Sequence, residues 1–236
     1  MEPKFHAFMF PWFAFAHTIP FLHLANKLAE KGHRVTFLLP KKAQKQLEHH
    51  NLFPDSIVFY PLTVPHVNGL PAGAETISDI AISKDNFLYE ALDLTRDQVE
   101  AAFRVLRPDL IFFDFGHWIP ELAKEHKIKT TGLSFVESVL SWKQYSYILT
   151  FFERVCHQLT TGFKSCDVIA LRTCKEIEGK FCDYISNQYQ RKVLLTGPIL
   201  PQPDTSKHVD EHWSQFLSGF PPGSVVFCAL GNQTVL

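Results

Sequence analysis

Two titratable residues follow predicted strands in this sequence, and together they would suit removal of a proton from a hydroxyl group. An apolar segment at residues 4–10 predicts a first strand, and His17 follows it after a short loop. A second apolar segment at residues 109–113 leads directly into Asp114. A histidine can accept a proton near neutral pH, and a carboxylate on its other ring nitrogen orients it and stabilises the imidazolium. The two residues therefore predict a base with its orienting partner.

The same residues also have a simpler interpretation. A histidine at a helix start is often a polar surface or capping residue, and an aspartate after a strand is often only a cap. The loop after the first strand contains Phe15 and Ala16 and no G-x-G-x-x-G pattern, so direct nicotinamide binding there is disfavoured. His49 and His50 have no partner at metal-ligand spacing, and we expect a surface role for them.

Alternating strands and helices must position these residues. An apolar stripe at Phe21, Leu24, Ala25 and Leu28 predicts a helix over 18–31, with Thr18 as its N-cap. Strands are predicted at 4–10, 33–39, 56–60, 109–113, 129–134, 167–171, 192–196 and 224–230, and helices at 18–31, 41–50, 84–106, 118–125, 137–162, 174–185 and 211–217. This alternation predicts an α/β fold with a Rossmann-like parallel sheet, in which ligands bind beyond the carboxyl ends of the strands.

The composition changes after Gly197, where prolines become frequent. We predict an N-terminal domain at 1–200, an interdomain linker at 201–222 and the first strand of a further α/β domain at 223–236. That last strand has no domain of its own behind it, so we expect the chain to be the first half of something larger.

Composition and charge exclude several classes of protein. The 236 residues include 23 Lys+Arg and 24 Asp+Glu, a net charge of 23 − 24 = −1, which argues against a nucleic-acid partner. A hydrophobic content of 46% argues against disorder, and no apolar stretch approaches the ~20 residues of a membrane span. The 5 cysteines lack C-x-x-C spacing, so we expect reduced thiols, no metal site and a cytoplasmic location.

Several motifs, in order along the chain, resemble the plant family-1 UDP-sugar glycosyltransferases. Residues 10–22 (FPWFAFAHTIPFL) resemble the opening of that family, in which a His-x-x-Pro helix start carries the catalytic base. Residues 31–37 and 108–114 resemble the next motif and the strand that ends in the base-orienting Asp. Residues 197–198 and 224–231 resemble the domain junction and the first C-terminal strand. Residues 11–15 and 38–42 are similar to the branch that adds a sugar to the sugar of a flavonoid glycoside.

The resemblance implies the N-terminal, acceptor-binding domain of a GT-B glycosyltransferase, which has two Rossmann-like domains. His17 would be the general base and Asp114 its partner, in an inverting transfer that uses a UDP-sugar as co-substrate and needs no cofactor or metal. The acceptor would be a small plant metabolite, above all a flavonoid or anthocyanin glycoside. The family's donor-binding signature lies beyond Leu236, so we expect residues 1–236 alone to be inactive until a C-terminal half is supplied by the same or a companion chain.

Further site residues follow from position and from the resemblance. Two positions depart from the family, because Ala16 often corresponds to Gly and Asn232 to Ser. The donor-binding candidates are Ala16, Thr18, Ser134, Gly231 and Asn232. Flat apolar walls suit a polyphenol, and roughly half of the aromatic candidates should instead be core. These acceptor-binding candidates are Phe13, Phe15, Phe115, Trp118, Phe135 and Trp142. The alternatives are a terpenoid glycoside as acceptor, or a non-enzymatic domain that binds apolar metabolites.

Overall fold

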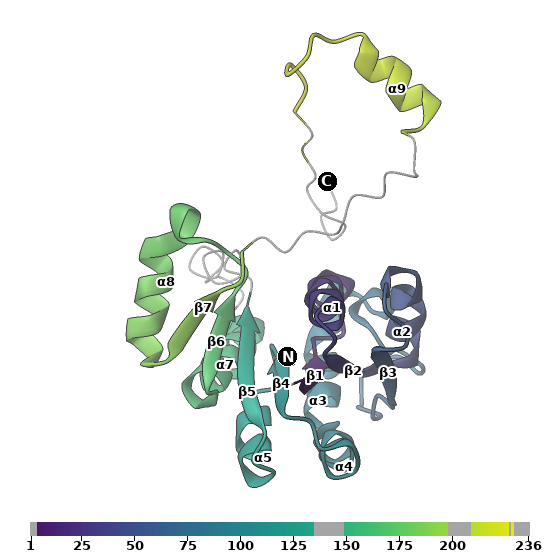
Figure 1. The fold of residues 1–236 in the computed structure, drawn as a ribbon. Coiled ribbons are helices and arrows are strands. Elements are labelled where there is room, and N and C mark those ends of the chain that lie inside the picture. The colour runs from purple at the N-terminus through teal and green to yellow at the C-terminus, as the bar shows by residue number, and fades with distance from the viewer. Residues whose placement is uncertain (1–3, 135–148, 198–208, 227, 229–236) are drawn as a thin grey trace. The chain divides into compact units, whose positions relative to one another are not determined.

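The computed structural model describes residues 4–134, 149–197, 209–226 and 228 of the chain. Residue contacts divide the chain into two units, Met1–Leu200 and Pro201–Leu236, which we describe separately. The first unit is built on one seven-stranded sheet with helices packed against it (Figure 1). The predicted linker at 201–222 and the predicted second domain at 223–236 stay predictions.

The seven strands are all parallel, in the order β3-β2-β1-β4-β5-β6-β7. The chain builds outward from β1 to β3 and then returns to place β4 on the other side of β1, which creates a topological switch point between β1 and β4. The predicted parallel α/β sheet is therefore confirmed. The strands are β1 (His6–Phe10), β2 (Arg34–Pro40), β3 (Ile57–Leu62), β4 (Leu110–Phe113), β5 (Lys129–Ser134), β6 (Val168–Leu171) and β7 (Lys192–Leu195).

Helices cover both faces of the sheet, because side chains along each strand point alternately to opposite sides. On β1, Ala7 and Met9 belong to the core that faces α1 and α2, whereas Phe8 and Phe10 belong to the core on the other face. The helices that the structure describes in this unit are α1 (Phe15–Glu30), α2 (Lys41–Leu47), α3 (Asp85–Asp93), α4 (Arg96–Leu106), α5 (Ile119–Glu125), α7 (Leu149–Ser165) and α8 (Lys175–Tyr189), with short 3-10 turns at Glu48–His50, Ile77–Asp79 and Ile82–Lys84.

The first helix begins earlier than the sequence predicts. Its N-cap is Ala14, whose carbonyl accepts the backbone N–H groups of His17 and Thr18 at 2.9 Å each. The prediction of Thr18 as N-cap is wrong: Thr18 is buried inside the helix, and its hydroxyl donates back to the carbonyl of Phe15 at 3.3 Å. His17 therefore lies in the first turn of α1 rather than in the loop before it.

The predicted single helix at 84–106 is two helices. The break falls at Leu94 and Thr95, between α3 and α4. The fully buried Thr95 donates its hydroxyl to the carbonyl of Leu92 at 2.6 Å, which satisfies the acceptor that a continuing helix would have used. The break lets α3 and α4 each pack an apolar face onto the sheet.

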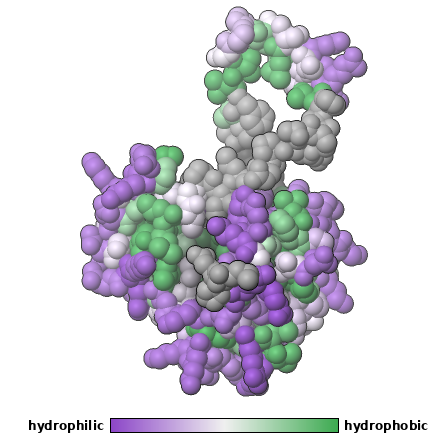
Figure 2. Space-filling view, in the orientation of Figure 1, coloured by the Kyte–Doolittle hydropathy of each residue, from purple (hydrophilic) through white to green (hydrophobic). Residues whose placement is uncertain are grey.

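The second unit contains α9 (Glu211–Ser218), where the sequence predicts a helix. Asp210 caps it, since its side chain accepts the backbone N–H of His212 at 2.9 Å. Trp213, Phe216 and Leu217 are exposed on this segment. Figure 2 shows both hydrophobic and hydrophilic surface on this unit. Residues 224–226 are not in a strand, and most of the rest of the strand predicted at 224–230 lies outside the described residues. Among the helices described for this chain, none is long and apolar enough to cross a membrane.

Candidate active site

The structure brings His17 and Asp114 together at the switch point of the sheet. Strands β1 and β4 are neighbours, with Phe10 paired to Phe113, so Asp114 is the first residue beyond the paired strand ends. Nδ1 of His17 lies 2.8 Å from Oδ2 of Asp114. The two residues are 97 positions apart in the sequence. This contact is the arrangement of a base and its orienting carboxylate.

The carboxylate of Asp114 is held at both of its oxygens. Its Oδ1 atom accepts the backbone N–H groups of Trp12 and Phe115, at 2.7 Å each, while Oδ2 faces His17. The side chain of Asp114 is 4% exposed and that of His17 is 24% exposed. Because Asp114 accepts from Nδ1–H, the basic lone pair of the imidazole lies on Nε2. The buried partner thus fixes both the ring orientation and the tautomer of the more accessible histidine.

The loop after β4 depends on a glycine. A Cβ atom placed on Gly116 would lie 2.8 Å from Cγ1 of Ile119 and 2.9 Å from Cε1 of Phe10. Both distances are too short for a side chain, so only glycine lets this loop pack closely on the end of β1. The close approach keeps Asp114 and Phe115 beside the first turn of α1.

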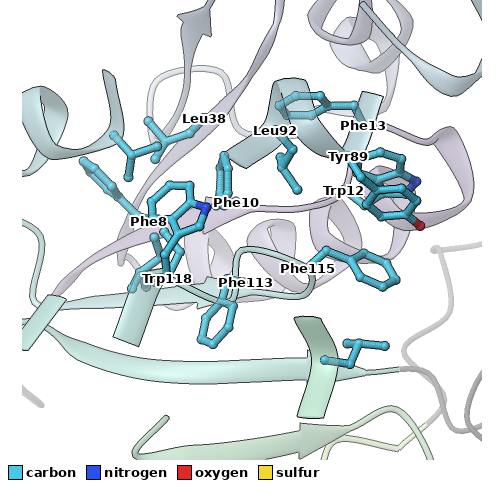
Figure 3. Close-up of a cluster of buried hydrophobic side chains, with 14 of the residues drawn as sticks. Phe8, Phe10, Trp12, Phe13, Leu38, Tyr89, Leu92, Phe113, Phe115 and Trp118 are labelled. Atoms are coloured by element: carbon cyan, nitrogen blue, oxygen red, sulfur yellow. The ribbon is translucent and has the colours of Figure 1, made fainter. Parts of the chain in front are cut away.

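A cluster of buried aromatic side chains, which includes Trp12, Tyr89 and Phe115, lies next to the pair (Figure 3). Trp12 stacks on Tyr89 of α3 with ring centroids 4.0 Å apart, and Phe115 meets both rings edge-on. Phe115 also lies 5.4 Å from the His17 ring, measured between centroids. Burial raises the pKa of the Tyr89 phenol, and the negative charges of Asp114 and Asp85 add to that effect. The cluster is buried, and through Phe115 it forms an aromatic wall beside the histidine.

The aromatic residues predicted to contact the acceptor lie in different environments. Phe13 is fully buried in the core, where it packs against Phe10 and Trp12. Trp118 is also buried, and Figure 3 shows it beside Phe8 and Phe10, at the other end of the cluster from Phe115. Phe15 is 40% exposed in the first turn of α1. Among these described candidates, only Phe115 has a ring contact with His17.

The donor candidates likewise occupy different environments. Ala16 is exposed in the first turn of α1, whereas Thr18 is buried and bonded to its own helix. Ser134 is buried at the end of β5, and its carbonyl accepts the N–H of Arg172 at 3.2 Å. The remaining candidates, Phe135, Trp142, Gly231 and Asn232, lie outside the described residues. Within the described residues, no group of three or more His, Cys, Asp or Glu is arranged to hold a metal ion.

Trp12, Tyr89 and Asp85 are site residues that the sequence analysis does not single out. Trp12 contributes a backbone N–H to Asp114 and a ring to the aromatic wall. Tyr89 and Asp85 lie one turn apart on α3. Their sequence signal is weak, because an aromatic residue in a helix and an acidic residue at its start are both ordinary features.

Comparison with solved structures identifies the fold. A crystal structure of Arabidopsis thaliana UGT89C1 matches 93% of this chain and 56% of its own, with a TM-score of 0.76 at 20% sequence identity. Phytolacca americana UGT2 matches 98% of this chain and 61% of its own, with a TM-score of 0.72 at 17% identity. The described sheet is that of the N-terminal domain of GT-B plant glycosyltransferases, as the sequence predicts.

Sequence comparison finds similar proteins of known family. The chain is 68% identical to UDP-glycosyltransferase 79B8 and 66% identical to UDP-glycosyltransferase 79B7, both of Arabidopsis thaliana, across 100% of its own length. It spans 60% of the length of each of these relatives. No family model matches it. The resemblance to the plant UDP-dependent glycosyltransferases that the motifs predict is therefore confirmed.

Proposed function

We propose that the chain forms the acceptor-binding half of an enzyme that transfers a sugar from a UDP-sugar to a hydroxyl of a small plant metabolite. The contact between Nδ1 of His17 and Oδ2 of Asp114, at 2.8 Å, carries this proposal. It supplies an oriented base at the sheet edge where ligands of such folds bind. The donor-binding half would come from the rest of a longer chain or from a companion chain.

The proposed reaction inverts the configuration at the anomeric carbon. His17 takes the proton of the acceptor hydroxyl on Nε2, and Asp114 stabilises the imidazolium through Nδ1–H. The acceptor oxygen attacks the anomeric carbon from the face opposite UDP, the new C–O bond forms as the bond to phosphate oxygen breaks, and UDP leaves with the electron pair. Backbone amides and helix N-termini can bind the diphosphate charge, so the proposal requires no metal or cofactor.

The favoured acceptor is a flavonoid or anthocyanin glycoside, with a hydroxyl of its sugar as the nucleophile. The support is the similarity of residues 11–15 and 38–42 to the sugar-adding branch of the family. Structures of Arabidopsis thaliana UGT89C1 were solved with quercetin and with UDP-L-rhamnose, so a protein of this fold binds a flavonoid and a UDP-sugar. The cysteine usage supports a cytoplasmic location for the reaction.

A terpenoid glycoside is the second candidate acceptor. The observation behind it is Glycyrrhiza uralensis UGT73P12, which was solved with glycyrrhetinic acid 3-O-monoglucuronide and matches 84% of this chain with a TM-score of 0.68. Paired assays of a flavonoid glycoside and a triterpenoid glycoside with the assembled enzyme separate the two candidates.

Replacing the base tests the proposal most directly. In the chain combined with a donor-binding half, His17→Ala should lower turnover by about 10²- to 10⁴-fold, since a positioned general base contributes that much. Acceptor affinity should survive, because the proton is transferred only during reaction. The measurement is UDP release at saturating acceptor. His49→Ala, which removes an exposed histidine, is the matched control and should keep full turnover.

Two outcomes would contradict the proposal. Turnover by His17→Ala close to that of the parent enzyme would remove His17 from the role of base. Acceptor binding without any UDP release in the assembled protein would favour the non-enzymatic binding domain. We also expect no turnover from the 236-residue chain by itself.

A further inference from the structure

A second buried carboxylate lies close to the proposed site without a role in the mechanism above. Asp85 is the first residue of α3 and is 9% exposed. Its Oδ1 atom is buried and has no hydrogen-bond partner among the described residues. Burial raises the pKa of this carboxyl to about 6. Buried polar groups in folded proteins are nearly always hydrogen-bonded, so an unpaired carboxylate oxygen calls for an explanation.

Asp85 lies on the same helix as Tyr89, one of the rings of the aromatic wall. It precedes Tyr89 by four residues, so the two side chains share one face of α3, about 6 Å apart along the helix axis. Tyr89 stacks on Trp12, whose backbone N–H binds Asp114. The charges of Asp114 and Asp85 both add to the rise in the pKa of the Tyr89 phenol that burial causes.

The start of α3 is fixed at the carboxyl edge of the sheet. The segment before it follows β3, and the N–H of Ile77 donates to the carbonyl of Phe13 at 3.0 Å. This hydrogen bond connects the segment before α3 to the loop between β1 and α1. That loop leads to His17. Side chains on a helix lean toward its N-terminus, so Asp85 is directed toward the same edge at which the acceptor enters.

We infer that Asp85 binds a hydroxyl group of the acceptor, resting on the proposed function of this site. A carboxylate oxygen without a protein partner is an acceptor for one O–H donor, and a hydroxylated ligand would supply the hydrogen bond that the fold leaves unmade. The ligand chemistry is therefore a polyhydroxylated molecule, whose hydroxyl is either an alcohol of an attached sugar or a phenol of an aromatic ring. Asp85 would determine which acceptors fit, and His17 would carry out the proton transfer.

Acceptor affinity measured without donor tests this role. The probes are quercetin and quercetin 3-O-glucoside, titrated into the chain combined with a donor-binding half. Asp85→Leu keeps the approximate shape and removes the acceptor oxygens, and it should raise the Kd of the glucoside by about 10-fold or more. Asp85→Asn keeps one carbonyl oxygen and should lose less affinity. Asp97→Leu is the matched control, because Asp97 also lies in the first turn of a helix, α4, but is exposed.

The pattern of affinities gives the source of the hydroxyl. A rise confined to the glucoside assigns Asp85 to a sugar alcohol, and an equal rise for both compounds assigns it to a phenol. Affinities of Asp85→Leu within about twofold of the parent for both compounds, as expected for Asp97→Leu, would overturn the inference, as would a parent enzyme that binds neither. Failure of the proposed function is distinguished separately, since His17→Ala should keep both affinities and lose turnover.

Discussion

Asp114 and Asp85 are two buried aspartates near one aromatic cluster, and they differ in how the fold satisfies their hydrogen bonds. Asp114 accepts three hydrogen bonds, from Trp12, Phe115 and His17. Asp85 has a buried Oδ1 without any partner in the described part of the chain. A satisfied buried carboxylate stabilises the fold that surrounds it, whereas an unsatisfied one destabilises it. The comparison separates a carboxylate held by the protein from one left for a ligand.

Removal of the satisfied carboxylate should have the largest effect. Asp114→Ala leaves two buried backbone N–H groups without acceptors, so the free energy of unfolding should fall by about 3 kcal/mol or more. Turnover of the assembled enzyme should fall by at least about 10²-fold, because His17 loses its orientation and its counter-charge. Chemical denaturation and UDP release measure the two effects.

Asp114→Asn sharpens this first prediction. Its amide oxygen can still accept from Trp12 and Phe115, so most of the stability should return. Its amide NH₂ would face Nδ1 of His17 and favour the wrong tautomer, so turnover should stay low. Full turnover in Asp114→Asn would show that the carboxylate charge has no part in the reaction.

Replacing the unsatisfied carboxylate of Asp85 should raise the free energy of unfolding at neutral pH, whereas replacing Asp114 should lower it. The pKa of Asp85 is raised from 3.8 to about 6 in the folded state, which corresponds to about 3 kcal/mol. The folded state therefore favours the protonated form. Protonation of Asp85 therefore stabilises the folded state fully below pH 3.8, and this stabilisation is lost as the pH rises through about 6. Asp85→Asn should be more stable than the parent chain at pH 7 and no more stable at pH 3.5, as measured by urea denaturation at both pH values.

The ion pair of an exposed carboxylate, Asp79, should contribute least to the free energy of unfolding. Asp79 is bound by Nζ of Lys42 at 3.0 Å, and both side chains are partly exposed. Burial acts to raise the pKa of Asp79, but backbone N–H groups and Lys42 outweigh it, so the pKa is lowered. Lys42→Ala should lower the free energy of unfolding by less than about 1 kcal/mol, and added salt should shrink the difference. A loss as large as that of Asp114→Ala would mean that exposure does not rank these carboxylates.

The sequence predicts the candidate catalytic residues well, because both of them follow the ends of strands. Continuous apolar runs before His17 and Asp114 indicate buried parallel strands, and the carboxyl ends of such strands meet at one edge. The pairing of Phe10 with Phe113 is a consequence of that topology. The strand pattern therefore predicts both His17 and its partner Asp114.

Helix limits and helix faces were harder to predict. Thr18 has the residue type of a cap, yet the carbonyl of Ala14 already starts the helix, because the loop conformation decides which N–H groups need an acceptor. Nothing in residues 84–106 marks Thr95 as a break, since its effect depends on a hydroxyl turned toward Leu92. The sequence does not single out Tyr89 and Asp85 for a related reason. Periodicity indicates that a helix has a buried face, but it does not show which residue, here Trp12, packs against that face.

The separation of 97 residues between His17 and Asp114 has a consequence for how the protein acquires its base. Neither segment contains the proton acceptor by itself, because it arises only when the first and fourth strands have joined at the centre of the sheet. Partial unfolding that is confined to the outermost strands should leave the reactive pair intact, whereas any opening at the centre removes it completely. The contact that makes His17 a base therefore forms in the same folding step as the pairing of the two central strands.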